Sequence, residues 1–128
     1  MTWHQQALRL LSAGTYVEVL DFLGKPLTVI SENMDVFPVI DAAYQGPVVS
    51  FVGGEQDDSV LQGFVLTHGL DELGGGIFCV AGSPTIANCT IVDNWTTNPV
   101  GQTVYCNGGS LNLIDCVIAN NHIGEIPQ

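Results

Sequence analysis

From residue 14 onward, hydrophobic residues come in short runs separated by polar residues and by Gly, Asn and Pro. Each run is four or five residues long and rich in Val, Ile, Thr, Phe and Tyr, which is too short for a stable helix and suits one β-strand. The pattern predicts three strands in a first coil, over residues 16–20, 27–31 and 38–41. Residues 2–12 fit either a helix or a first strand at 8–11, and in both cases a cap over the open end of that coil.

Two long segments of the chain repeat at a spacing of 27 residues. Gly74–Cys79 corresponds to Gly101–Cys106, and Ser83–Asn94 corresponds to Ser110–Asn121. Two earlier segments join the series, residues 48–51 aligning with 76–79 at a spacing of 28 and residues 60–69 with 85–94 at a spacing of 25. A period in the twenties indicates a solenoid.

A repeat made of short strands buries its inward side chains only by coiling and stacking, and successive coils then pair in parallel. The sequence therefore predicts an all-β, single-stranded parallel β-helix of about four coils. We expect one domain over residues 1–128, with an N-terminal cap at 1–13, coils at 14–121 and a tail at 122–128.

Stacking places like residues above one another. Cys79 falls over Cys106 and Cys89 over Cys116 in apolar surroundings, which predicts reduced thiols in the core. A disulfide within either pair is the alternative, because adjacent strands lie ~4.8 Å apart and disulfide Cα distances begin near ~4.4 Å. Asn94 over Asn121 fits either a side-chain amide ladder or two exposed turn residues.

The charge of the chain is strongly negative. The 128 residues include thirteen acidic residues and only two basic ones, Arg9 and Lys25, which gives a net charge of -11. This charge argues against nucleic acid or an anionic membrane as partner. No apolar run reaches the ~18 residues of a membrane span, and residues 1–4 lack the features of a signal peptide, so neither membrane insertion nor a signal peptide is expected in this chain.

The repeats Gly74–Cys79 and Ser83–Asn94, preceded by Leu61–Gly69, resemble those of bacterial right-handed parallel β-helix proteins of the pectate-lyase-like superfamily. Residues 13–18 and 22–29 resemble the first coil of that group. The resemblance implies a right-handed helix and an extracellular or cell-surface location. It implies no single activity, because the superfamily includes polysaccharide lyases, glycoside hydrolases and adhesins.

Five acidic residues are the candidates for a cation such as Ca²⁺ or for a carboxylate pair, since they lie in predicted turns of neighbouring coils: Glu55, Asp57, Asp58, Asp71 and Glu72. Solvated loops are the alternative. The superfamily's lyases commonly use Arg or Lys as base, and Arg9 and Lys25 both fall in the first coil. The paired-aspartate and Gly-His-Gly signatures of its hydrolases are missing, so no catalytic residue is carried over.

Three further side chains are candidates for binding. Trp95 and Tyr105 could stack on sugar rings, and His68 is a polar turn residue near Asp71. We therefore expect a non-catalytic module for binding or structural assembly, with glycans, a cell surface or other protein subunits as partners, the subunits meeting open coil ends. The alternative is a polysaccharide-active enzyme, a lyase or glycoside hydrolase, that uses the acidic loops with Ca²⁺.

Overall fold

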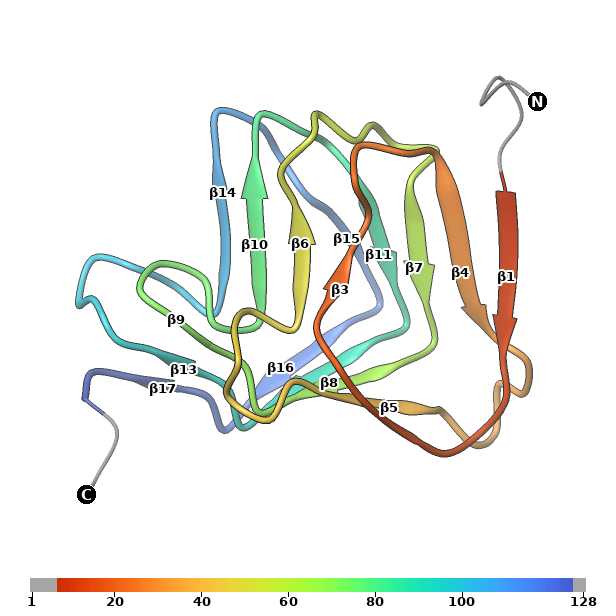
Figure 1. Ribbon diagram of the computed structural model, residues 1–128, viewed down its shortest axis with the longest axis horizontal. Coiled ribbons are helices and arrows are strands. Elements are labelled where there is room, and N and C mark those ends of the chain that lie inside the picture. Colours follow the sequence, from red (N-terminus) through yellow and green to blue (C-terminus); the bar gives the residue numbers. More distant parts are fainter. Residues whose placement is uncertain (1–6, 126–128) are drawn as a thin grey trace.

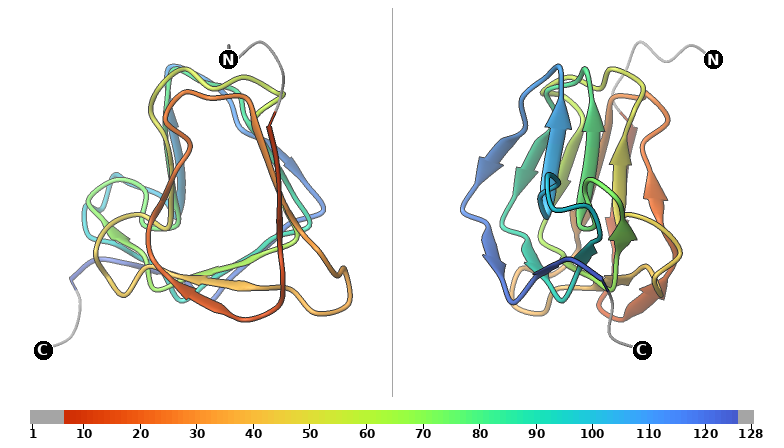
Figure 2. Two further views of the ribbon diagram at one scale, coloured as in Figure 1. Left: turned by 45° about the vertical axis from the view of Figure 1, so that its right-hand side comes forward. Right: turned by 90° about the vertical axis from the view of Figure 1, so that its left-hand side faces the viewer.

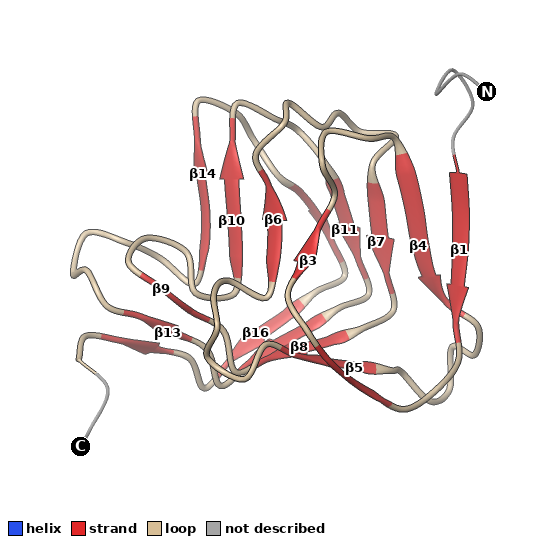
Figure 3. Cartoon of the chain, in the orientation of Figure 1, coloured by secondary structure: helices blue, strands red, loops and turns tan. Residues whose placement is uncertain are grey.

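The computed structural model describes residues 7–125, which form a right-handed parallel β-solenoid of about four turns (Figure 1). Strands and their connecting turns make up this whole part of the chain, which contains no helix (Figure 3). All strand pairings are parallel. The predicted all-β fold class is confirmed.

The strands stack into four sheets, named here in the order in which the chain meets them. Sheet A consists of β1 (Ala7–Leu11), β4 (Leu27–Ser31), β7 (Val60–Gln62), β11 (Thr85–Ala87) and β15 (Asn112–Ile114). Sheet B consists of β2 (Thr15–Val17), β5 (Val39–Asp41), β8 (Val65–Thr67), β12 (Thr90–Val92) and β16 (Val117–Ala119). Sheet C consists of β3 (Leu20–Asp21), β6 (Val49–Phe51), β10 (Ile77–Val80) and β14 (Val104–Asn107). Sheet D consists of β9 (Leu70–Asp71), β13 (Trp95–Thr96) and β17 (His122–Ile123).

Seen along the coils, sheets A, B and C form the three sides of a roughly triangular outline, and sheet D extends from the corner between B and C (Figure 2). The predicted registers are confirmed. Cys79 pairs with Cys106 at the spacing of 27, Ile77 with Val49 at 28, and Thr85 with Val60 at 25. The drift in period comes from the turns between strands.

The first coil differs from the prediction, which placed residues 27–31 and 38–41 in it. These segments form β4 and β5, which stack on β1 and β2 and belong to the second coil. Ala7–Leu11 is a strand that pairs in register with Leu27–Ser31, so the strand alternative is correct for this segment. The single strand predicted over residues 16–20 is wrong, because the chain bends at Glu18 and Val19 and divides into β2 and β3. This bend lets the coil turn from sheet B directly into sheet C. In the described part of the chain, neither the first nor the second coil has a sheet D strand, and sheet D begins with β9.

The corner that follows sheet B repeats one backbone conformation in each described coil after the first. Tyr44, His68, Asp93 and Asn120 all have left-handed φ, between 56° and 60°. The N–H of each donates to the carbonyl oxygen of the next in this column, at 2.7, 3.2 and 3.2 Å. Asn, Asp and His tolerate this conformation better than most residues, so the later polar members of the column match its geometry.

Gly69 and Gly75 lie where backbone segments approach closely. A Cβ on Gly75 would overlap the backbone of Trp95, and a Cβ on Gly69 would overlap the carbonyl oxygen of Gly75. The repeated glycines therefore let the backbone of one coil lie directly on the next, and no phosphate-binding role is needed to explain them.

The interior consists of columns of inward side chains. In sheet C, Phe22 packs on Phe51 with ring centroids 4.6 Å apart, and the column continues through Cys79 and Cys106. In sheet B the column runs Ile40, Leu66, Ile91, all buried, and ends at Ile118, which is 47% exposed. The core is thus tightly covered in its middle and open toward the last coil.

The Asn94–Asn121 ladder is confirmed. Asn94 is 1% exposed, and its Oδ1 accepts from the Gly69 N–H at 2.8 Å. Its Nδ2 donates to the Leu66 carbonyl and to Asn121 Oδ1, both at 3.1 Å. Asn121 Nδ2 in turn donates to the Ile91 carbonyl at 2.9 Å. Asn94 and Asn121, one in each of two successive coils, thus satisfy backbone groups at the corner where sheet D branches off.

Candidate binding surfaces

Glu55 is a buried structural carboxylate. It is 2% exposed, and its two oxygens accept from the backbone N–H groups of Gly53 at 2.9 Å and Gly24 at 2.8 Å. Gly53 and Gly24 belong to adjacent coils, and their backbones are too close for a Cβ between them. Both carboxylate oxygens therefore hold the corner between sheets C and A together.

The other acidic candidates do not gather around Glu55. Asp57 and Asp58 are exposed in the same loop, which leads from sheet C to sheet A. Asp71 and Glu72 lie at the opposite end of the sheet C strands, where Asp71 Oδ2 accepts from the N–H groups of Leu73 and Gly74. Within residues 7–125, no three His, Cys, Asp or Glu side chains are grouped closely enough to hold a metal ion. The two acidic loops proposed as one site are two separate loops.

His68 forms a small polar cluster on the corner between sheets B and D. Its Nδ1 lies 3.1 Å from Asp41 Oδ1, and its ring packs on Tyr44 with centroids 5.2 Å apart. Desolvation, the largest single influence, raises the pKa of Asp41, but the Ala43 N–H and the hydrogen bond and charge of His68 together bring it below its ordinary value. His68 therefore fastens one coil to the next and does not contact Asp71 in this arrangement.

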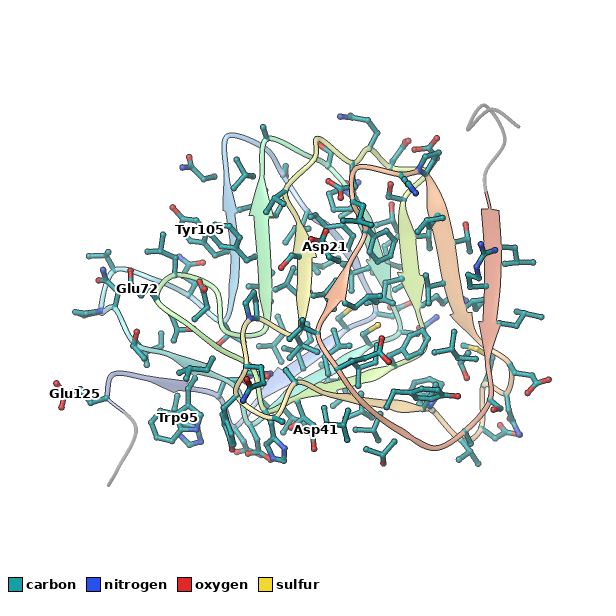
Figure 4. The ribbon with its side chains drawn as sticks, in the orientation of Figure 1. Asp21, Asp41, Glu72, Trp95, Tyr105 and Glu125 are labelled. Carbon is teal, nitrogen blue, oxygen red and sulfur yellow. The ribbon has the colours of Figure 1, made fainter. Side chains whose placement is uncertain are left out.

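Trp95 and Tyr105 each belong to an aromatic pair on the outside of the solenoid. Trp95 stacks on His122 with centroids 4.3 Å apart, and Tyr105 stacks on Phe78 with centroids 5.8 Å apart and rings 6° from parallel. Figure 4 shows Trp95 on sheet D and Tyr105 on sheet C, on the same side of the molecule as Glu72. His122 covers one face of the Trp95 ring. Tyr105 and His122 lie on the edge strands β14 and β17, so each has one ring face that is not covered by its stacking partner.

The last coil exposes a row of apolar side chains, which we call the C-terminal face: Leu113, Ile114, Val117, Ile118 and Ile123. Each is between 42% and 55% exposed. Leu113 and Ile118 occupy the same inward columns as the buried Ile86 and Ile91. They are therefore core-type positions that no further coil covers within residues 7–125, and in the same part of the chain β14, β15, β16 and β17 each have a paired strand on one side only.

The first coil differs from the last in carrying polar side chains over its core, which we call the N-terminal face: Arg9, Tyr16 and Glu18. Its apolar side chains Leu8, Leu10 and Val17 are also exposed. Arg9 takes the inward position above Val29, and Tyr16 takes the one above Ile40. Arg9, Tyr16 and Glu18 line a hollow of about 220 Å³ whose floor is Val29 and Ile40. The Tyr16 hydroxyl donates to the Ser12 carbonyl at 2.9 Å. Inward-pointing polar residues on an edge coil oppose pairing with another chain.

Sequence reasoning missed three of these features. The stacking of His122 on Trp95 follows from the 27-residue repeat, which aligns the two positions. The inward position of Arg9 could not be predicted, because its register with Val29 depends on a strand that the pattern left undecided. The structural role of Glu55 had no signal, since an acidic residue in a Gly-rich loop usually lies in solvent.

Neither a protein-family model, a curated protein nor a solved structure matches the chain. The structure also contains, within residues 7–125, no helix with the length and apolar character needed to cross a bilayer.

Proposed function

We propose that this protein is a non-catalytic assembly module that associates with a second copy of itself through the C-terminal face. The observation that supports this function is the exposure of Leu113 and Ile118 at positions whose equivalents one coil earlier are fully buried. Contiguous apolar surface of this kind marks an interaction site, and exposed edge strands favour pairing with another chain.

A second copy fits this face because an identical apolar row and identical strand edges meet about a two-fold axis, the commonest symmetry of homodimers. The N-terminal face suits this role poorly, since Arg9 and Glu18 would lose solvent on contact. The dimer is therefore end to end through the last coils only. The net charge of -11 on each subunit opposes association, so added salt should strengthen the dimer by screening it.

Sedimentation velocity over a range of protein and salt concentrations tests the proposal. We expect a monomer–dimer equilibrium that shifts toward dimer as salt rises. Ile118→Glu should abolish the dimer, because a carboxylate would enter the contact from both sides. Val52→Glu is the matched control, since Val52 is 48% exposed on a middle coil and its change should leave the dimer intact.

The proposal fails if the protein is a monomer at high concentration and high salt, or if Ile118→Glu and Val52→Glu associate equally. Circular dichroism of both variants separates loss of the contact from loss of the fold.

Glycan binding is the second candidate function, and the aromatic pairs Phe78–Tyr105 and Trp95–His122 favour it. If the protein binds glycans, we also propose that it is related to the pectate-lyase-like superfamily and is located outside the cell or at its surface. A sugar would stack on the open faces of Tyr105 and His122, and Glu72, on the same side of the molecule as Tyr105, would accept hydrogen bonds from its hydroxyl groups. A glycan array with wild type and Tyr105→Ala is the test, and a blank array rejects it.

The polysaccharide-active enzyme is the weaker alternative, since the acidic loops lie at opposite ends of sheet C. Incubation with acidic polysaccharides, with and without Ca²⁺, followed by measurement of unsaturated and reducing ends, decides it directly. Product formation that survives Asp71→Asn and Asp57→Asn would exclude these loops as its source.

A further inference from the structure

The two pairs of stacked cysteines differ in geometry. Cys79 Sγ and Cys106 Sγ lie 2.8 Å apart, and both side chains belong to one inward column of sheet C. In the other pair, Cys89 Sγ contacts the carbonyl oxygens of Ala87 and Leu61, and Cys116 Sγ contacts those of Ile86 and Ile114. A hydrogen bond between two sulfur atoms thus joins Cys79 and Cys106, whereas the thiols of Cys89 and Cys116 are directed at carbonyl oxygens.

We propose that Cys79 and Cys106 are an oxidisable pair that forms a disulfide between the third and fourth coils, whereas Cys89 and Cys116 stay reduced. Register partners on adjacent parallel strands are ~4.8 Å apart, inside the usual ~4.4–6.8 Å range of disulfide Cα distances. The sulfur atoms need to close by less than ~1 Å to reach the ~2.05 Å bond length. The inference does not rest on the proposed assembly.

The two thiols differ in access, which sets the order of the chemistry. Cys79 is fully buried, and Cys106 is half-buried on β14, the last strand of sheet C. The oxidant is a low-molecular-weight disulfide. Cys106 loses its proton to solvent, and its thiolate attacks one sulfur of that disulfide, which gives a mixed disulfide and releases one small thiolate.

In the second step Cys79 loses its proton, and its thiolate attacks Cys106 Sγ. The protein disulfide forms, the mixed disulfide breaks, and the second small thiolate leaves and takes up a proton. Two protein thiols are oxidised and one small disulfide is reduced to two thiols. Burial, with a contribution from Cys106, raises the pKa of Cys79 to about 12, so this step is slow near neutral pH and speeds up about tenfold per pH unit.

The bridge would fasten the last coil to the coil beneath it. It would close a loop of 27 residues. The closed loop lowers the conformational entropy of the unfolded chain, which raises the midpoint of thermal unfolding by about 10 °C. Strand β14 is one of the two edge strands of sheet C and has a hydrogen-bonded neighbour on one side only, so the covalent link would reinforce a one-sided pairing.

The test is to incubate the protein with oxidised glutathione, block free thiols and digest with a protease that cuts before Asp. Cuts before Asp71, Asp93 and Asp115 place Cys106 in peptide 93–114 and Cys116 in peptide 115–128, while Cys79 and Cys89 share peptide 71–92. We expect mass spectrometry to find 71–92 joined to 93–114. Four free thiols, a lasting glutathione adduct on Cys106, or 71–92 joined to 115–128 would each overturn the proposal.

Matched variants separate the two pairs. Cys116→Ala should keep the cross-link and the rise in unfolding midpoint on oxidation, and Cys106→Ala should lose both. Cys89→Ala should also keep the cross-link, which assigns it to Cys79. Loss of the cross-link in Cys89→Ala would overturn the assignment. Circular dichroism of the reduced variants confirms that each one folds.

Discussion

The two end coils of the solenoid share a backbone plan and differ in what occupies their inward positions. At the first coil, Arg9 and Tyr16 stand in the columns that Val29 and Ile40 continue. At the last coil, Leu113 and Ile118 stand in those same columns. The comparison teaches that the two ends of a repeat protein can differ through a few side chains at equivalent inward positions, polar at one end and apolar at the other.

The same comparison implies a gradient of stability along the chain. Middle coils bury both faces of every inward side chain, whereas the last coil buries one. Substitutions at equivalent positions in neighbouring coils should therefore differ sharply in cost, and matched pairs of this kind measure the difference directly.

The largest expected effect is in the inward column of sheet B. Ile91 is fully buried and its register partner Ile118 is 47% exposed. Ile91→Ala should lower the free energy of unfolding by about 3–4 kcal/mol, and Ile118→Ala by about 1 kcal/mol, because the exposed site leaves little cavity. Chemical denaturation of both variants, in dilute protein so that association does not contribute, checks this. Equal costs would mean that the last coil is covered in solution.

The asparagine ladder gives the second matched pair. Asn94→Ala would leave the Gly69 N–H and the Leu66 carbonyl without their partner in a buried corner, for a loss of about 2–3 kcal/mol. Asn121→Ala should cost about 1 kcal/mol, because water reaches the last coil and can replace the amide. Thermal unfolding of the two variants, with Asn98→Ala in the loop after β13 as a control, measures the difference.

Much of the fold could be predicted from the sequence because strands stack in register and the repeat exposes that register. The pairing of Cys79 with Cys106 follows from the spacing of 27 residues alone. The stacking of Leu66 under Ile91 follows in the same way from the spacing of 25. The division of residues 16–20 into two strands could not be predicted, since alternation continues through the bend at Glu18.

The candidate site was much less predictable. Spacing along the chain does not say at which end of a sheet a loop lies, so Asp57 and Asp71 were grouped although sheet C separates them. Glu55 was grouped with them because its partners, Gly53 and Gly24, are backbone groups that carry no sequence signal. The repeat already aligned Phe78 with Tyr105, and the same 27-residue period applied to Trp95 would have paired it with His122.

Arg9→Leu is designed to remove the chemical difference between the two ends of the solenoid. Leucine in this column would cover Val29 and remove the charge that opposes stacking, so the stability of the monomer should rise by about 1 kcal/mol. With both ends apolar, dimers should extend into longer end-to-end chains, visible in light scattering as a mass that grows with concentration. Arg9→Gln, which keeps a polar end, is the control, and growth of both variants alike would show that Arg9 does not close this face.

The smallest effect concerns a contact far from both ends, between Asp41 and His68. Because the folded state lowers the pKa of Asp41, its contribution to stability is present above the ordinary value of 3.8 and is lost as pH falls through the lowered one. Asp41→Asn should therefore cost at most about 1 kcal/mol near neutral pH and nothing in stronger acid, where the unfolding curves of variant and wild type converge. Asp57→Asn, in an exposed loop, should show no such convergence, since it should differ little from wild type at any pH.

Because the contact between Asp41 and His68 joins middle coils, acid that removes it should leave the difference in unfolding free energy between Ile91→Ala and Ile118→Ala unchanged. A difference that disappears with the contact would mean that the gradient along the solenoid depends on this corner and not on the uncovered last coil.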